Sequence, residues 1–316
     1  MKEKIVVIVG PTAVGKTSLS IELAKHFDGE VISGDSMQIY KGLDIGTAKA
    51  SLKEQAGVPH HLINEINPDE SYSVSDFQKK ARLLIKEITA RGKLPIIVGG
   101  TGLYIESLLY DVSHGGTGKT DEAFRLEKEK EADEKGNVYL WEELNRLDPA
   151  AAEKIHYNNR RRVIRAMEVH HVTGQLFSVF QNEREKKEQL YDAKIIGLNT
   201  TRDLLYERID LRVEQMMNNG LEKEAKKLFK LGLTDTQSSK GIGYKEWFPY
   251  FEGMCSKAVV LEMIQLHSRR YAKRQLTWFK NRLSDVDWFN LIEYPNDKEL
   301  IFEEIKDFLD PSADPT

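Results

Sequence analysis

Short apolar runs alternate with helix-like stretches over the first third of the chain. The strand-like runs are residues 5–9, 30–33, 60–63 and 94–98. The run at residues 5–9, which is apolar and β-branched throughout, is typical of a strand that is covered on both faces, whereas residues 60–63 are a weaker strand candidate. Loops and helix-like stretches follow these runs, and the repeated order of strand, loop and helix predicts a parallel α/β sheet.

Helix signals mark the stretches between and after these runs. Ser73 and Asp76 have the spacing of a capping box, ahead of an amphipathic stretch that ends near Gly92. The pattern of the last third predicts helices at residues 203–231, with a break at residues 218–220, and at residues 257–282, and strands at residues 194–198 and 286–289.

The loop after the first strand-like run has a phosphate-binding motif. Residues 10–17 match Gly-x-x-x-x-Gly-Lys-Thr and lie between a predicted strand and a predicted helix, which is the context that a P-loop requires. Backbone N–H groups of such a loop bind anionic oxygens, Lys16 adds a positive charge, and the Thr17 hydroxyl can ligate Mg²⁺. We therefore expect Mg²⁺ as a cofactor and a diphosphate or triphosphate held by Gly10, Pro11, Thr12, Ala13, Val14, Gly15, Lys16 and Thr17.

A second Gly-Lys-Thr sequence occurs at residues 118–120, but Ser113 stands where the motif needs its first glycine. No strand-like run leads into it. We interpret residues 115–120 as a loop and not as a second phosphate site.

The P-loop alone leaves open which group is transferred. In ATPases an apolar strand usually ends in an acid that holds Mg²⁺, whereas residues 94–98 are followed by Gly-Gly-Thr-Gly. The carboxylate is instead Asp35, after the second strand-like run. Parallel strands end at one edge of a sheet, so Asp35 and Thr101 should lie near the P-loop. From its spacing, Asp35 is equally well a functional carboxylate or a turn residue.

The chain changes character between about residues 111 and 189. This stretch has almost no strand-like run and has the pattern of several polar helices, one of which ends at Gly174. Because strand-like sequence resumes afterwards, the stretch interrupts a sheet. We predict a P-loop NTPase-like parallel-sheet core at residues 1–112 and 190–316, with an all-helical insertion at residues 113–189.

Composition narrows the class of protein. The net charge is −4, so the chain is not a uniformly basic nucleic-acid binder, although local basic patches remain compatible with one. A single cysteine, Cys255, excludes an internal disulfide and a cysteine-based zinc site. The first apolar run is far too short to cross a membrane and leads into the P-loop, so we expect a cytoplasmic enzyme with no membrane partner.

Motifs outside the P-loop are more specific than the P-loop itself. They read DSMQIYKGLDIGTAK at residues 35–49, PHHL at residues 59–62, VGGTGLY at residues 98–104, RRVIRAMEV at residues 161–169, GIGY at residues 241–244 and AKRQLTWF at residues 272–279. This series, in order over nearly the whole chain, closely resembles that of the bacterial tRNA dimethylallyltransferases, also called tRNA isopentenyltransferases. Residues 112–120 depart from the family by their high glycine content.

The resemblance implies a reaction and roles for three residues. The family transfers a dimethylallyl group from dimethylallyl diphosphate to N6 of adenosine-37, next to the tRNA anticodon, so the P-loop would hold a diphosphate leaving group. Asp35 would bind the adenine amine and take its proton, Thr101 would lie beside the same base, and Arg212 would contact the diphosphate. The target adenosine would have to leave its stack.

The resemblance also implies a surface for the tRNA anticodon stem-loop. Basic residues cluster at residues 160–165 and 269–282, and the second cluster includes Tyr271, Trp278 and Phe279. Taken alone, such clusters are more often solvated faces and such aromatic residues are as often core, but the resemblance favours RNA contact. The implied tRNA-binding residues are Asp35, Ser36, Met37, Gln38, Thr101, Asn159, Arg160, Arg161, Arg162, Val163, Lys240, Gly243, Tyr244, Lys245 and Arg274.

Three other functions are weighed against this one. A P-loop nucleotide or small-molecule kinase would consume ATP and need no RNA. A relative that prenylates free adenosine phosphates would not need a basic helical insertion, and a non-catalytic RNA-binding module would not need a complete P-loop with Asp35 and Thr101. Nothing in the sequence requires more than a monomer, and the sequence does not say which tRNAs are modified.

Overall fold

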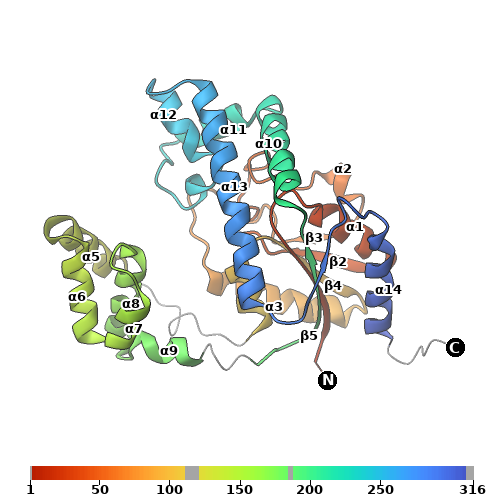
Figure 1. Ribbon diagram of the computed structural model, residues 1–316, viewed down its shortest axis with the longest axis horizontal. Helices are drawn as coiled ribbons and strands as arrows, with labels where there is room; N and C mark the ends of the chain where they lie inside the picture. The colour runs from red at the N-terminus through yellow and green to blue at the C-terminus, as the bar shows by residue number, and fades with distance from the viewer. Residues whose placement is uncertain (1, 111–120, 184–187, 311–316) are drawn as a thin grey trace. The chain divides into compact units, whose positions relative to one another are not determined.

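A sheet of six strands, paired in parallel throughout, forms the centre of the larger of two units (Figure 1). The structure is a computed structural model that describes residues 2–110, 121–183 and 188–310. The sheet unit comprises Met1–Leu109 and Tyr191–Thr316, and the helical unit comprises Tyr110–Leu190. The Gly-Lys-Thr sequence at residues 118–120 and the predicted boundary at residues 112 and 113 lie outside the described residues.

The strand order β3-β2-β4-β1-β5-β6 places β1 inside the sheet, between β4 and β5. Strands with neighbours on both sides and helices on both faces need apolar residues at every position, which is what the run after Lys4 supplies. The predicted parallel sheet is thereby confirmed. The strands are β1 (Lys4–Val9), β2 (Gly29–Ser33), β3 (His60–His61), β4 (Leu94–Val98), β5 (Asp192–Leu198) and β6 (Val286–Phe289).

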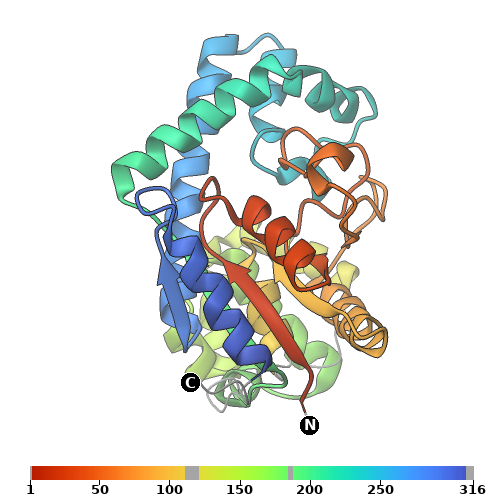
Figure 2. The same ribbon diagram turned by 90° about the vertical axis from the view of Figure 1, so that its right-hand side faces the viewer.

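Helices cover both faces of the sheet (Figures 1 and 2). On one face of the sheet, Leu23 of α1 and Ile301 of α14 are buried with Val6 in one core. On the other face, α3 and α4 pack against each other. The helices of the sheet unit are α1 (Lys16–His26), α2 (Leu52–Gln55), α3 (Val74–Ala90), α4 (Gly102–Leu109), α10 (Arg202–Asn218), α11 (Leu221–Lys230), α12 (Phe248–Phe251), α13 (Lys257–Arg282) and α14 (Asp297–Leu309), with short 3₁₀ turns η1 (Ser238–Lys240) and η2 (Lys245–Trp247).

The predicted start of α3 and the predicted break after α10 are both confirmed. Ser73 Oγ accepts the N–H of Asp76 at 3.2 Å, and the Asp76 carboxylate accepts the N–H of Ser73 at 2.9 Å, so the capping box is complete. Gly220 has φ 100° and begins α11 in the left-handed conformation that glycine adopts readily. The helix α14 has no counterpart among the predicted elements.

The helical unit has a core of its own. Leu140, Leu144 and Val163 are fully buried there together with Ala151. Gly174 ends one of its helices in the left-handed conformation, as predicted. The described helices are α5 (Glu122–Lys135), α6 (Asn137–Leu147), α7 (Pro149–Lys154), α8 (Arg160–Thr173) and α9 (Phe177–Glu183). Across both units, no described helix has the length and apolar character needed to cross a membrane.

Candidate active site

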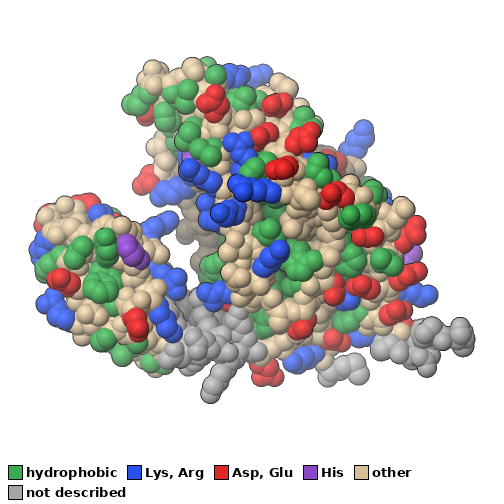
Figure 3. Space-filling view, viewed as in Figure 1, with side chains coloured by type: hydrophobic (Ala, Val, Ile, Leu, Met, Phe, Trp, Pro, Cys, Tyr) green, Lys and Arg blue, Asp and Glu red, His purple; other side chains and the backbone are tan. Residues whose placement is uncertain are grey.

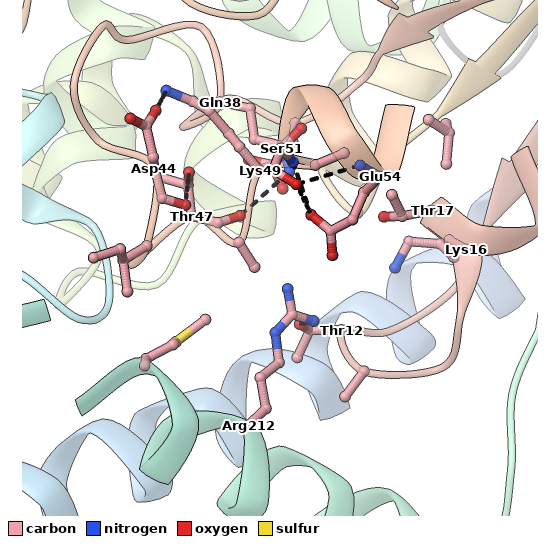
Figure 4. A pocket seen from close by; sticks show the side chains of 18 of the residues that line it. Thr12, Lys16, Thr17, Gln38, Asp44, Thr47, Lys49, Ser51, Glu54 and Arg212 are labelled. Atoms are coloured by element: carbon pink, nitrogen blue, oxygen red, sulfur yellow. Dashed lines mark hydrogen bonds and ion pairs between the residues drawn. The ribbon is translucent and has the colours of Figure 1, made fainter. Parts of the chain in front are cut away.

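Loops at the carboxyl edge of the sheet line a cavity of about 970 Å³ (Figure 4). The P-loop follows β1, Asp35 follows β2 and Gly100 follows β4, so three neighbouring strands deliver their loops to one place. Figure 4 shows Lys16 and Arg212 pointing into the same space from α1 and α10. Five of the eight predicted phosphate-binding residues therefore line one cavity with Asp35: Thr12, Ala13, Gly15, Lys16 and Thr17. Gly10, Pro11 and Val14 are not among the described residues that line it.

Backbone conformation turns the P-loop into an anion site. Gly15 has φ 95°, and α1 begins directly after it. No side chain in the described part of the chain caps this helix, so its first N–H groups face the cavity without a protein acceptor from a cap. Such groups, with the positive end of the helix dipole behind them, stabilise an anion.

Lys16 lies under this loop. Its Nζ donates a hydrogen bond of 2.6 Å to the carbonyl oxygen of Pro11. The pKa of Lys16 is lowered to about 7, mainly by burial and also by the positive charge of Arg212, while the Asp35 carboxylate acts in the opposite direction. A bound polyanion would supply the negative charge that restores the ordinary protonated state of this lysine.

Two arginines one turn apart on α10 bind the outer side of the P-loop. Arg208 Nε donates to the carbonyl oxygen of Ala13 at 2.9 Å, and Arg212 Nη1 donates to Thr12 Oγ1 at 3.1 Å. Burial lowers the pKa of Arg212 and Asp35 acts against that shift, but a guanidinium stays charged at neutral pH. The side chain of Arg212 is thus a fixed cation at the cavity.

Asp35 has the contact of a turn residue and also lines the larger cavity, so its functional role stays a prediction. Its Oδ1 accepts the N–H of Met37 at 2.9 Å, which is the contact of a turn residue. The same half-buried side chain also faces the cavity. Burial raises the pKa of Asp35, while the Met37 N–H and the charges of Lys16 and Arg212 oppose the rise. A carboxylate with a raised pKa holds a proton more readily than an exposed one.

A second cavity of about 310 Å³ shares its wall with the first. Asp35, Thr47, Arg212 and Tyr271 line both cavities. The second cavity is otherwise bordered mainly by segments that the sequence assigned to tRNA, namely Ser36, Met37, Lys240, Gly243, Tyr244, Lys245 and Arg274. Asp35 therefore lines both the larger cavity, beside the P-loop, and the smaller one.

Thr101 lies just behind this wall. Its Oγ1 accepts the N–H of Ser36 at 3.0 Å, and it also interacts with the side chain of Tyr271. Thr101 is not among the described residues that line either cavity, but Ser36 and Tyr271, which it contacts, both line the smaller one.

Thr17 is exposed at the start of α1 and lines the larger cavity. Among the described residues no group of three or more His, Cys, Asp or Glu side chains could hold a metal ion by itself. A cation here would take most of its ligands from phosphate oxygens and water, and Mg²⁺ usually binds in this way. The hydroxyl of Thr17 beside a phosphate site fits such an ion.

Burial corrects part of the tRNA-binding prediction. The side chains of Val163 and Tyr244 are fully buried, and so is that of Phe279, which the sequence had offered for base stacking. Each lies on the apolar side of its segment, and the Tyr244 hydroxyl donates to Glu224 at 2.7 Å. Arg160 is held by the carboxylates of its neighbours in the helical unit. These side chains make internal contacts in this structure, and their part in tRNA binding stays a prediction.

Other basic residues remain at the surface. Figure 3 shows Lys and Arg side chains gathered over the middle of α13, where Arg270, Lys273 and Arg274 are exposed. In the helical unit Arg161 and Arg162 are exposed, and Asn159 precedes them. Arg269, by contrast, is bound to both oxygens of Asp210 at 2.6 Å. The basic clusters are thus part solvated face and part internal ion pair.

Two buried polar residues near the cavities had no assigned role in the sequence. Gln275, 5% exposed, accepts the N–H of Thr12 and donates to the carbonyl oxygen of Gly100. Glu224, 6% exposed, accepts three consecutive backbone N–H groups from Asp44, Ile45 and Gly46. The only sequence signal was a polar residue at a helical position that the pattern assigns to the core.

Comparison with known proteins agrees with this arrangement. The sequence model of the IPP transferase family matches residues 38–282. Two curated relatives, both described as tRNA dimethylallyltransferase, are similar over nearly their whole length. The protein of Enterococcus faecalis is 54% identical over 309 residues, 97% of this chain and 98% of the relative. That of Bacillus pumilus is 53% identical over 304 residues, 95% of each chain.

Solved structures are similar as well. A tRNA isopentenylpyrophosphate transferase of Bacillus halodurans has a TM-score of 0.74 at 46% identity and covers 98% of both chains. A eukaryotic dimethylallyltransferase described as acting on tRNA has a TM-score of 0.83 at 30% identity, over 97% of this chain and 79% of that one. The family match over most of the chain and these full-length relatives show that the chain belongs to the IPP transferase family.

Proposed function

We propose that this protein transfers a dimethylallyl group from dimethylallyl diphosphate to N6 of adenosine-37 in tRNA, giving N6-isopentenyladenosine and diphosphate. The observation that carries the proposal is the position of Asp35 on the wall between a P-loop cavity and a second cavity. The names of the full-length relatives support it. The donor would occupy the larger cavity and the target base the smaller one.

On the donor side, the bond between the allylic carbon and a diphosphate oxygen breaks. Negative charge then develops on the diphosphate. The N–H groups of the P-loop, the ammonium of Lys16 and the guanidinium of Arg212 are already in place to stabilise that charge, without reorganisation during the reaction. Mg²⁺, held by Thr17 and phosphate oxygens, would neutralise further charge on the leaving group.

On the acceptor side, the N6 lone pair of adenine forms the new bond to carbon. The amine must lose a proton as it does so, because an exocyclic amine is a weak nucleophile and becomes acidic on alkylation. Asp35 accepts this proton, and the burial that raises its pKa makes it a stronger base than an exposed carboxylate. Diphosphate leaves with both bonding electrons, so charge and atoms balance.

The polynucleotide would be held outside the smaller cavity. Adenosine-37 must leave its stack to reach Asp35, and phosphates of the anticodon stem-loop need cations around the entrance. Lys240, Lys245 and Arg274 line this cavity, and exposed Arg161 and Arg162 on the helical insertion would contact the same stem-loop. Since one chain supplies both the P-loop and Asp35, a cytoplasmic monomer suffices for the reaction.

A kinase is the competing function. It would need ATP in the P-loop and a means to direct phosphoryl transfer. The acid expected after the strand next to β1 is absent from the sequence, where Gly99 and Gly100 follow β4. The full-length relatives are described as transferases that act on tRNA and not as kinases, so we do not favour this function.

The deciding experiment is a transfer assay with radiolabelled dimethylallyl diphosphate and Mg²⁺. The acceptors are bulk unmodified tRNA, AMP and no acceptor, and the Lys16→Ala protein serves as the matched background. Label in tRNA alone is the expected result. Label in AMP would indicate a free-nucleotide prenyltransferase, and no label in either acceptor, with ATP consumed in a parallel reaction, would overturn the transferase proposal.

A further inference from the structure

We propose that Gln275 is a positioning residue, which holds two loops at a fixed distance from each other. The donor loop is the P-loop, and the acceptor loop is the loop after β4 at residues 99–101. The proposal rests on the proposed function, because it concerns the distance between diphosphate donor and adenine acceptor. It arises from a single side chain of α13 that binds the backbone of two different loops.

The contacts of Gln275 join the P-loop to the loop after β4. Its Oε1 accepts the N–H of Thr12 at 3.0 Å, and its Nε2 donates to the carbonyl oxygen of Gly100 at 2.9 Å. Gly100 is followed by Thr101, which holds the N–H of Ser36, the residue after Asp35. The P-loop is therefore connected to the segment of Asp35 and Ser36 through three hydrogen bonds, two of them made by the Gln275 amide, and the peptide link between Gly100 and Thr101.

Tyr271 extends this connection on the same face of α13. It precedes Gln275 by four residues, so the two side chains lie one above the other. Tyr271 interacts with the side chains of both Thr101 and Gln275, and it lines both cavities. The helix thus contacts the donor loop and the acceptor loop with neighbouring side chains.

The fit at Gly100 shows that this contact is close. A Cβ added to Gly100 would lie 2.0 Å from Gln275 Nε2. Any side chain at position 100 would displace the amide, so a glycine there is a geometric requirement of the Gln275 contact. Gly99 is also held close to a neighbouring loop, since a Cβ there would lie 2.3 Å from the carbonyl oxygen of Gly34.

A positioning role differs from phosphate binding in what it changes. Gln275 occupies the N–H of Thr12, so this N–H is directed at the helix and is not needed as a ligand of the diphosphate. Transfer requires the allylic carbon and N6 at contact distance and in line, and displacement by about 1 Å is enough to cost about a hundredfold in rate. Loss of the amide should therefore lower the rate of transfer and leave diphosphate affinity nearly unchanged.

Gln237 serves as a control for the loss of such a pair of hydrogen bonds, at a position that is exposed, whereas Gln275 is buried. Gln237 also accepts a backbone N–H and donates to a backbone carbonyl oxygen, both of Tyr72. Among the described residues that line the two cavities Gln237 does not occur. Both Gln275→Met and Gln237→Met remove one accepted and one donated hydrogen bond and introduce a side chain of similar size. Only Gln275 joins the two loops.

The experiment measures single-turnover transfer to tRNA, and the dissociation constants of inorganic diphosphate and of tRNA, for wild type and both variants. For Gln275→Met we expect a transfer rate about tenfold to a hundredfold lower, with both dissociation constants within about threefold of wild type. Gln237→Met should transfer at the wild-type rate. A wild-type rate in Gln275→Met, or a loss confined to the dissociation constants, would overturn the positioning role.

A second variant covers the case in which Gln275→Met fails to fold. Gly100→Ala pushes the amide away from the other side and should show the same loss of rate with retained diphosphate binding. If both single variants fold, the double variant should be no slower than the slower single one, because both remove one contact. Additive losses would contradict a shared contact, and inactivity of the wild type on tRNA would instead contradict the proposed function.

Discussion

Asp35 both stabilises a turn and lies at the boundary of the two cavities, where we propose that it acts as a base. A short turn after β2 needs an acceptor for the N–H of Met37, and the transfer reaction needs a base at the boundary of the two cavities. One carboxylate has two oxygens, so Oδ1 can serve the turn while the second oxygen faces the substrate. In the proposed reaction, turn geometry would therefore fix the direction of the base.

Changes at Asp35 and at Lys16 should separate chemistry from binding. Asp35→Ala removes the proton acceptor but none of the phosphate contacts, so we expect turnover at least about a hundredfold lower with nearly normal diphosphate affinity. Lys16→Ala removes a charged contact to the diphosphate, and should weaken its binding about tenfold or more as well as turnover. Titration calorimetry with inorganic diphosphate and single-turnover transfer to tRNA check both. Near-wild-type turnover in Asp35→Ala would show that the base is another group.

The raised pKa of Asp35 also predicts an effect on stability. A carboxyl group whose folded pKa lies above its unfolded value costs stability once it is ionised, and that cost disappears as the pH falls below the unfolded value. Asp35→Asn keeps an acceptor for Met37 and carries no charge, so the ligand-free variant should unfold at a higher temperature than wild type at neutral pH. The difference should narrow in acid, and thermal unfolding at a series of pH values measures it. A variant that is less stable at neutral pH would contradict the direction of the shift.

The sequence predicted those residues of the candidate site whose type and spacing indicate a chemical role. The P-loop, Asp35 and Arg212 were named before any geometry, and five residues of the P-loop line one cavity with Asp35 and Arg212. It could not separate exposed from buried members of a motif, so it named the fully buried Val163 and Tyr244 beside exposed residues. Nor could it find Gln275, because a hydrogen bond between α13 and the P-loop joins residues far apart in the chain.

At the scale of elements, regular patterns were predicted well and weak ones were missed. The bounds predicted for α13 and β6 are those of the structure. The helix α14 buries only Ile301 and Ile305, two apolar positions one turn apart among many charges, and no side chain among the described residues caps its start. Its place in the fold depends on packing against the sheet and α1, and local sequence does not report that packing.

Glu224 shows how one element holds another beside the site. Its carboxylate, on α11, accepts the N–H groups of Asp44, Ile45 and Gly46 and the hydroxyl of Tyr244. The segment that it holds lines both cavities through Ile45, Gly46 and Thr47. A carboxylate is suited to this because it only accepts hydrogen bonds, and every group around it donates.

Glu224→Gln should therefore be costly although it changes few atoms. The new NH₂ group would face backbone N–H donors and leave some of them without an acceptor, which we expect to lower the free energy of unfolding by about 1–3 kcal/mol. Glu222→Gln on the same helix breaks only the surface ion pair with Lys257 and should cost less than about 1 kcal/mol. Urea denaturation of both variants, followed by tryptophan fluorescence, gives the comparison. Equal losses in the two would show that the backbone contacts of Glu224 contribute little.

At the scale of the whole molecule, the chain leaves the sheet unit and returns to it at adjacent points. Tyr110 and Gln189 form an isolated antiparallel bridge at the two ends of the helical unit. Insertions whose ends are close together can be lost without stretching the chain that remains. The helical unit also has its own core, so the sheet unit does not depend on it for buried apolar residues.

Replacing residues 111–188 by a short Gly-Ser linker between Tyr110 and Gln189 should therefore leave a folded protein that binds inorganic diphosphate as wild type does. The P-loop, Asp35, Arg212 and Gln275 all lie in the sheet unit. If the insertion contacts the anticodon stem-loop, as we propose, the same protein should bind tRNA at least about tenfold more weakly, because the exposed cations of α8 are lost. The matched control is the full chain with Arg161→Ala and Arg162→Ala, which should reproduce part of the loss and reduce its dependence on salt. Wild-type affinity for tRNA in the shortened protein would assign the whole RNA surface to the sheet unit.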